Sequence, residues 1–391
     1  MRRLPVLLTA VAAAFALPFA VGTPAGADGT APGSRSLALT PTPGSTHVRG
    51  VDGSLRLTGR TGFASLRAVR LGHRVQRVTL DRDATVPAGA SVTLWVRAGL
   101  DAGGWSEWTE ATAGRPTALP VASRTVQVRV ALAAAAGDGP TVRGVGVTPG
   151  PAVAAGRRLA TKPYRAKVYA TREGLVGGTT ANGHKIRKND RFVALPSARA
   201  LSDKGSDDYS VKVCTSSRCA WASVWDVGPW NIKDDYWNPK NRRETWQDLP
   251  RGRPEAEAAY YDGYHKGKDA SGRKVVNPAG IDLADGTFWK DLKLEDNSWV
   301  TVTYLWTGSN PQARVSSPEG MLNVRHGAST SAPVVGTAAD GASVAVACRV
   351  SGQRVAGPVG TTAAWYRVAP GMYVSGGYLA LPGGGRRVRS C

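Results

Sequence analysis

Short runs of alternating apolar and polar residues, interrupted by turn-forming residues, recur along most of this 391-residue chain. A period of two places alternate side chains on opposite faces of a β-strand, whereas an amphipathic helix needs a period near 3.6. The 47 glycines and 25 prolines interrupt the pattern often enough to keep such strands short. An apolar fraction of 42% is sufficient for packed cores. We therefore expect a mainly β protein of two or three domains, and we exclude global disorder.

The first 27 residues have the features of a secretory signal peptide. Two arginines precede the apolar stretch 4–21, and residues 25–27 (Ala-Gly-Ala) form a small-residue cleavage site. We predict cleavage after residue 27, which gives a secreted, extracellular protein without stable membrane insertion. The alternative is a retained signal anchor.

The chain is strongly basic, with 50 Lys and Arg against 29 Asp and Glu and a formal net charge of +21. Outside the cell this charge favours peptidoglycan or another anionic cell-wall polysaccharide as the partner, and not nucleic acid. The positive charge is also spread over the whole chain, whereas a nucleic-acid site would concentrate it. A basic surface that only confers solubility is the alternative, and we expect a monomer.

Lysine usage divides the chain, because every lysine lies between positions 162 and 293. This change in composition, together with Pro- and Gly-rich junctions, predicts separate modules. The predicted segments are a signal peptide (1–27), a disordered linker (28–44), a β-sandwich (45–148), a second β domain (161–308) and a C-terminal β domain (316–391).

The predicted sandwich rests on alternation such as Val126, Val128 and Val130 between polar residues. Frequent turns between such segments are typical of antiparallel sandwiches. The segment loosely resembles secreted jelly-roll accessory domains. Its Trp105 and Trp108 are either exposed rings that stack on sugars or core residues.

The middle domain carries four motifs in a characteristic order. They are Thr-Ala-Asn-Gly at 180–183, Ala-Leu-Pro at 194–196, Val-Trp-Asp-Val-Gly-Pro-Trp at 224–230 and Gly-Ile-Asp-Leu at 280–283. Together they resemble the signature of the RlpA-like double-psi β-barrel, over about 164–307. The resemblance implies a six-stranded barrel shared with expansins and family 45 endoglucanases. It also implies cleavage of peptidoglycan glycan strands by a lytic transglycosylase.

The resemblance makes Asp226 the leading catalytic carboxylate and places Asp282 in the polysaccharide groove. Trp225 and Trp230 flank Asp226, and apolar surroundings raise the pKa of a carboxyl group so that it can act as an acid. A lytic transglycosylase needs only one such acid, because the muramyl C6 hydroxyl is the nucleophile. A glycoside hydrolase would instead use Asp226 and Asp282 as a pair.

Several positions depart from the family pattern. His184 stands where active RlpA-like enzymes have an acidic residue, and Phe192 and Val227 replace a His and an Arg. Asp226 and Asp282 are also 56 positions apart, much farther than in the family. His184 is either an acid, base or orienting group or a polar turn residue. The alternative function is therefore a non-catalytic, expansin-like or wall-binding protein. A protease inhibitor on the same barrel would need an inhibitory loop that the sequence does not identify.

A long excursion, 231–278, interrupts the barrel pattern and contains a predicted short helix at 254–268. Loops of this length are usually functional or packed by their own side chains. We expect Trp230, Trp237 and Asn182 to contact substrate together with Trp225. The alternative is that the aromatic residues pack the excursion onto the barrel. We expect no metal and no other cofactor.

Four cysteines allow three pairings. Pairing within each domain joins Cys214 to Cys219 across a short turn and Cys348 to Cys391 in the C-terminal domain. The sequences Met-Leu-Asn-Val-Arg-His-Gly (321–327) and Tyr-Val-Ser-Gly-Gly-Tyr-Leu (373–379) resemble a bacterial SH3-like domain. That resemblance implies a small barrel that binds peptidoglycan peptides.

Two aromatic residues of this tail domain are candidates for its ligand groove. We expect Trp365 and Tyr378 to line it, although Trp365 is also a candidate for the core. A spacer domain that binds nothing is the alternative.

Overall fold

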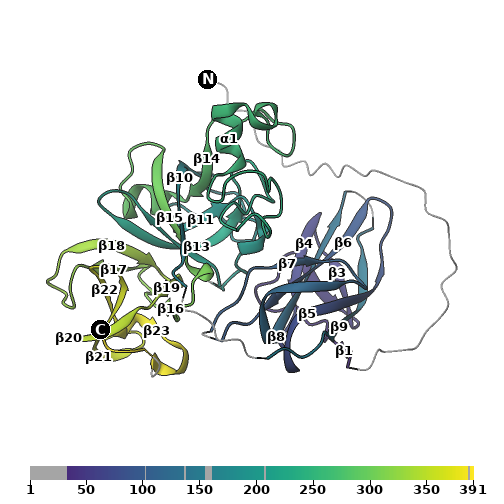
Figure 1. Ribbon diagram of the computed structural model, residues 1–391, viewed down its shortest axis with the longest axis horizontal. Helices are drawn as coiled ribbons and strands as arrows, with labels where there is room; N and C mark the ends of the chain where they lie inside the picture. Colours follow the sequence, from purple (N-terminus) through teal and green to yellow (C-terminus); the bar gives the residue numbers. More distant parts are fainter. Residues whose placement is uncertain (1–32, 102, 136–137, 155–160, 207, 386–387) are drawn as a thin grey trace.

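The computed structural model describes residues 33–101, 103–135, 138–154, 161–206, 208–385 and 388–391. The predicted signal peptide lies outside these residues. Strands predominate, and Figure 1 shows three groups of them, coloured purple to blue, teal to green, and yellow. The mainly β fold class is therefore confirmed.

The first group is a nine-stranded, antiparallel sheet whose alternating apolar residues form one core. Val126, Val128 and Val130 all point into that core, as their spacing predicts. The strands are β1 (Arg35–Ser36), β2 (Val48–Val51), β3 (Ser54–Leu57), β4 (Thr61–Ser65), β5 (Val69–Thr85), β6 (Ala90–Ala98), β7 (Thr109–Ala111), β8 (Pro116–Ala134) and β9 (Thr141–Pro149).

The linker prediction for 28–44 does not hold from Arg35 onward. Strand β1 pairs with β9, and the Leu37 N–H donates to the Val145 carbonyl at 2.8 Å. Leu37 is buried and Leu39 packs against the same core. The apolar residues of this segment therefore keep it on the sheet despite its Pro- and Gly-rich composition.

The second group is a closed barrel of six strands. Around it the order is β10, β14, β11, β13, β12, β15 and back to β10, with β10–β14 and β11–β13 parallel and the other pairs antiparallel. The strands are β10 (Tyr164–Arg172), β11 (Phe192–Leu195), β12 (Ser210–Cys214), β13 (Cys219–Val227), β14 (Ala279–Leu283) and β15 (Ser298–Tyr304). Inward-facing Val, Ala and Leu side chains fill its interior.

The excursion between β13 and β14 is folded onto the barrel. It contains helix α1 (Glu255–Asp262), shorter than the predicted helix, and the 3-10 turn η2 (Tyr264–Gly267). Buried ion pairs hold it, with Asp234 bound to Arg243 and Asp235 bound to Arg199 at 2.7 Å. Three short helical segments complete the domain: η1 (Ala198–Ala200), η3 (Gly286–Asp291) and η4 (Leu305–Thr307).

The third group forms the C-terminal domain. Its strands are β16 (Gln312–Val315), β17 (Met321–Arg325), β18 (Val334–Ala339), β19 (Ser343–Ala345), β20 (Cys348–Gly357), β21 (Gly360–Ala369), β22 (Met372–Ser375) and β23 (Leu379–Ala380), with 3-10 turns η5 (Gly376–Tyr378) and η6 (Pro382–Gly385). Strand β18 pairs in parallel with β13, so the sheet of this domain continues that of the barrel. This pairing ties the two domains together.

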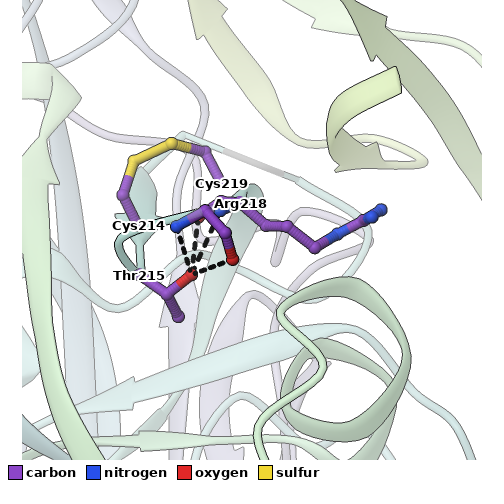
Figure 2. Close-up of a disulfide and its surroundings, with 5 residues drawn as sticks. Cys214, Thr215, Arg218 and Cys219 are labelled. Atoms are coloured by element: carbon purple, nitrogen blue, oxygen red, sulfur yellow. Dashed lines mark hydrogen bonds between the residues drawn. A yellow bond between two sulfur atoms is a disulfide. The ribbon is translucent and has the colours of Figure 1, made fainter. Parts of the chain in front are cut away.

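Both predicted disulfides are present, Cys214–Cys219 and Cys348–Cys391. Figure 2 shows the first, which closes the β12–β13 hairpin above a turn. The Thr215 hydroxyl accepts hydrogen bonds from the Ser217 and Arg218 N–H groups at 3.3 and 3.1 Å. The second disulfide joins the start of β20 to the last residue of the chain.

Candidate functional site

The barrel register brings the two predicted carboxylates together. Strand β11 lies between β13 and β14, and its Ala194 is paired with Asp226 on one side and with Asp282 on the other. Directly paired residues of neighbouring strands point to the same face. Asp226 and Asp282 therefore lie in one row despite their separation in the sequence, because the excursion 231–278 leaves and rejoins the barrel between them.

Glu173, which the sequence motifs do not single out, completes the cluster. It directly follows β10, which runs parallel to β14, and its N–H donates to the Leu283 carbonyl at 2.9 Å. It lies close enough to Asp226 for the charge of that carboxylate to raise the pKa of Glu173. Parallel neighbours end at the same edge of a sheet. An acidic residue just after β10 was thus the signal that could have identified it.

The Glu173–Asp226 pair is arranged to hold a single proton. Burial, and then the charge of Asp226, raise the pKa of the Glu173 carboxyl far above its ordinary value. Burial also raises the pKa of Asp226, but backbone N–H groups of Ala181 and Val227 donate to its Oδ1 at 2.7 and 2.8 Å and favour its ionised form. Two carboxylates this close cannot both ionise readily. We therefore assign the proton to Glu173 and the negative charge to Asp226.

Asp282 is a second, separate acid beside this pair. The Thr171 hydroxyl donates to its Oδ1. Burial, opposed by this hydrogen bond and reinforced by the charge of Asp226, raises the pKa of Asp282 to about 7. A Cβ atom added at Gly228 would lie 3.9 Å from Asp282 Oδ2, so the backbone runs close to this carboxyl.

No cation neutralises these three carboxyl groups within ion-pair distance among the described residues. The nearest recorded pair at this edge is Arg172 with Asp285, at 3.6 Å. Neither oxygen of Glu173 receives a hydrogen bond from a donor in the described part of the chain. The cluster therefore consists of buried carboxyl groups with raised pKa values. Such groups are typical of functional sites and are unfavourable for stability.

His184 lies on the turn beside the cluster. Its Nε2 is 2.6 Å from Asp190 Oδ2, and its ring centroid is 4.8 Å from that of Trp225. The same turn supplies the Ala181 N–H to Asp226, and the Asn182 N–H donates to the Trp225 carbonyl at 3.1 Å. The turn thus positions Asp226 through its backbone. In the described part of the chain, no hydrogen bond or ion pair joins the His184 ring to Glu173, Asp226 or Asp282.

Asn182 is buried, and its Oδ1 accepts hydrogen bonds from the Thr180 hydroxyl and the His184 N–H at 2.7 and 3.1 Å. These bonds brace the turn. A Cβ atom added at Gly183 would lie 2.3 Å from Thr46 Oγ1, and the φ angle of Gly183 is +84°. Only glycine suits that position, where the N-terminal segment approaches the turn closely.

The predicted aromatic contacts divide into accessible and enclosed rings. Trp225 is half-buried and stacks on Phe192 with centroids 5.5 Å apart, and Trp230 is half-buried and donates to Asn277 Oδ1 at 3.0 Å. Trp237 is fully buried among Tyr236, Tyr304 and Trp306. A ring so enclosed cannot stack on a ligand in this conformation, so the substrate-contact prediction does not fit Trp237.

The C-terminal domain has a groove of about 350 Å³ lined by Tyr378, Trp365, Arg325 and Asn323, among others. Trp365 is only 2% exposed, and its Nε1 donates to the Gln353 carbonyl at 2.8 Å. It is therefore a core residue that forms the groove wall. Tyr378 remains half-buried at the groove.

Comparison with known families gives separate matches for the barrel and for the C-terminal domain. Residues 164–303, the barrel strands, match a family described as "Domain of unknown function (DUF8814)". Residues 320–380 match "Bacterial SH3 domain", which confirms that part of the sequence analysis. A search of curated proteins found no match. The match of the barrel carries no activity, so its likeness to RlpA-like enzymes stays a proposal.

The described residues contain no helix that is both long and apolar enough to cross a membrane. Within the same ranges, no group of three or more His, Cys, Asp or Glu side chains is arranged to hold a metal ion.

Proposed function

We propose that this is a secreted cell-wall protein whose barrel cleaves peptidoglycan glycan strands, in the manner of a lytic transglycosylase. The observation that carries the proposal is the strand register that places Asp226 and Asp282 on either side of Ala194, with Glu173 following β10 at the same edge of the barrel. Because the charge of Asp226 raises the pKa of Glu173, the two carboxyl groups act as one proton carrier. A reaction in which the C6 hydroxyl of the sugar is the nucleophile requires one such proton carrier and no second carboxylate to activate water.

In this mechanism one proton circulates. The protonated pair gives its proton to the glycosidic oxygen as the C1–O4 bond breaks. The C6 hydroxyl oxygen of the same sugar then bonds to C1, and its proton returns to the pair. The products together are isomeric with the substrate, and no water is consumed. When Asp282 is ionised, its negative charge beside the pair stabilises the positive charge that develops at C1.

The neighbouring turn and rings support this site. His184, held by Asp190 and packed on Trp225, positions the turn whose Ala181 N–H binds Asp226. We place the glycan strand along the half-buried faces of Trp225 and Trp230. Because its imidazole is hydrogen-bonded to Asp190, His184 is a positioning residue that acts on Asp226 through the turn.

The C-terminal domain gives the wall association. Bacterial SH3 domains commonly bind cell-wall peptidoglycan, and the groove at Tyr378 is the proposed ligand site. The pairing of β18 with the first residues of β13 attaches this domain to the barrel. Two disulfides suit an oxidising, extracellular location, as the predicted signal peptide requires.

The test compares wild-type protein with Asp226→Asn and Glu173→Gln on purified peptidoglycan. We expect wild type to release fragments ending in 1,6-anhydromuramic acid, and both variants to lose about 10²- to 10⁴-fold in rate. Asp248→Asn, at an exposed carboxylate of the excursion, is the matched control and should leave the rate unchanged.

A wall pull-down on the same samples separates cleavage from binding. All variants should be retained equally, because the SH3 domain is intact in each. Retention by the wall without any cleavage product from wild type would reject the enzyme and favour the expansin-like, non-catalytic alternative.

A further inference from the structure

The outer face of the barrel carries a pattern that the carboxyl cluster does not explain. Strand register places Tyr169 opposite Trp299, and Lys167 opposite Thr301. In the next row Arg165 is opposite Thr303, which is in turn opposite Lys212 of β12. The alternate residues of β10 and β15 face the barrel core. These cross-strand rows therefore lie together on the outside of the barrel.

These rows bring together three cations, Arg165, Lys167 and Lys212. Among the described residues, no ion pair joins Arg165, Lys167 or Lys212 to a carboxylate. Burial, and then the positive charge of Arg165, lower the pKa of Lys212. Like charges are thus gathered at the Arg165 and Lys212 end of this face, while Asp296 lies near its Tyr169 end. The cations generate a local positive potential suited to an anionic ligand.

Aromatic rings border the same cations. Trp299 is 36% exposed, its ring centroid is 5.7 Å from that of Tyr169, and Lys167 Nζ lies 5.6 Å from its centre. Burial, and then the charge of Asp296, raise the pKa of Tyr169, and the exposed Tyr261 and Tyr260 of α1 are near enough to add to this shift. Exposed aromatic rings offer flat apolar surfaces to the C–H faces of sugar rings.

We propose that Arg165, Lys167, Tyr169, Lys212 and Trp299, here called the basic-aromatic face, bind an anionic polysaccharide at a site separate from the carboxyl cluster. The aromatic pair stacks on sugar rings, and the cations meet carboxylates carried by the polymer. The inference goes beyond the proposed function, because occupancy of this face requires no bond cleavage.

The test uses the full secreted chain with polygalacturonate as a soluble anionic polysaccharide and dextran as its neutral counterpart. R165E/K167E should weaken polygalacturonate binding on the order of tenfold, because two attractive contacts become repulsive. The matched control is R49E/R56E, which reverses two exposed arginines that lie opposite each other in the N-terminal sheet. The control should bind as wild type, and dextran should bind much more weakly than polygalacturonate.

Trp299 tests the aromatic part of the face. Trp299→Ala should weaken binding about fivefold, and Trp299→Phe should restore most of it. Trp289→Ala, at another exposed tryptophan of the barrel, should have no effect. Thermal melts of each variant check that it is folded.

Three results would overturn the inference. One is equal weakening by R165E/K167E and R49E/R56E, which would show an effect of net charge alone. Another is unchanged binding in Trp299→Ala. The third is tighter binding of single-stranded DNA than of polygalacturonate through the same residues. Asp226→Asn should bind polygalacturonate normally, so failure of the proposed cleavage and failure of this binding site are distinguishable.

Discussion

Glu173, Asp226 and Asp282 provide two different kinds of acid at one edge of the barrel. Backbone N–H groups hold Asp226 ionised, its charge helps to keep Glu173 protonated, and Asp282 titrates near neutrality. Environment alone separates the roles of three chemically similar groups. The arrangement has a cost in stability, because protons must be retained where water would otherwise ionise the carboxyls.

Asp282→Asn should therefore make the protein more stable at neutral pH. The pKa of Asp282 is raised to about 7 from an ordinary value near 3.9, so the folded state binds its proton more tightly than the unfolded state does. The contribution of this group is most favourable below about pH 4 and declines as the pH rises through 7. Allowing for partial solvent screening, the gain at pH 8 is about 1 kcal/mol.

Urea unfolding of wild type and Asp282→Asn between pH 4 and 8 measures this effect. The free energies of unfolding should agree at pH 4 and separate as the pH rises. A variant that is less stable than wild type at pH 8 would show that the carboxylate is stabilising, against this account.

The sequence identified Asp226 and Asp282 through motif resemblance, and strand register explains why they meet. It missed Glu173, because the acidic residue just after β10 gains its meaning only once β10 is known to run parallel to β14, which is a tertiary property. It also could not separate ligand-facing from core tryptophans, since Trp237 and Trp365 owe their burial to neighbours distant in the sequence. The turn at 180–183 was identified, but its backbone role was not.

At the scale of elements, alternation predicted the strands well, and both disulfides were identified from cysteine spacing and module boundaries. The family resemblance predicted a six-stranded barrel, whereas the order of its strands followed only from the structure. The two disulfides differ in what they restrain. Cys214 and Cys219 are 5 residues apart in a hairpin that Thr215 already braces, whereas Cys348 and Cys391 are 43 apart and fix the chain terminus.

Removing the long-range disulfide should cost more stability than removing the local one. Loop-closure entropy in the unfolded chain predicts a loss of about 4 kcal/mol for C348S/C391S and about 2 kcal/mol for C214S/C219S. Chemical denaturation of both variants under identical conditions measures the difference. Equal losses, or a larger loss for the local pair, would contradict the prediction.

At the scale of the whole molecule, Glu107 joins the N-terminal sheet to the barrel. Its carboxylate accepts hydrogen bonds from the indole N–H groups of Trp237 and Trp306, the latter at 2.7 Å, and from Asn238 Nδ2 at 2.6 Å. Nearby, Arg97 pairs with Asp208 at 2.8 Å, and its guanidinium lies over the Trp108 ring. Trp108 is buried in the barrel core, so of the two predicted roles, sugar-stacking ring or core residue, it has the second.

Glu107→Ala should weaken the attachment of the N-terminal sheet to the barrel. It leaves two indole N–H groups without an acceptor and removes one of the two acceptors of Asn238 Nδ2, so we expect a loss of about 3 kcal/mol and separate unfolding of the two domains in calorimetry. Glu110→Ala is the matched control, since Glu110 makes only an exposed pair with Lys233 and should cost less than about 1 kcal/mol. Equal effects of the two changes would show that Glu107 is not the joint.

The central claim is that the barrel cleaves glycan strands with one circulating proton and without water. Digestion of purified peptidoglycan in water enriched in ¹⁸O tests it directly by mass spectrometry of the new chain ends. The account predicts anhydro ends that contain no ¹⁸O, and no such ends with Asp226→Asn. New reducing ends that carry one ¹⁸O atom, or no new ends at all from wild type, would contradict it.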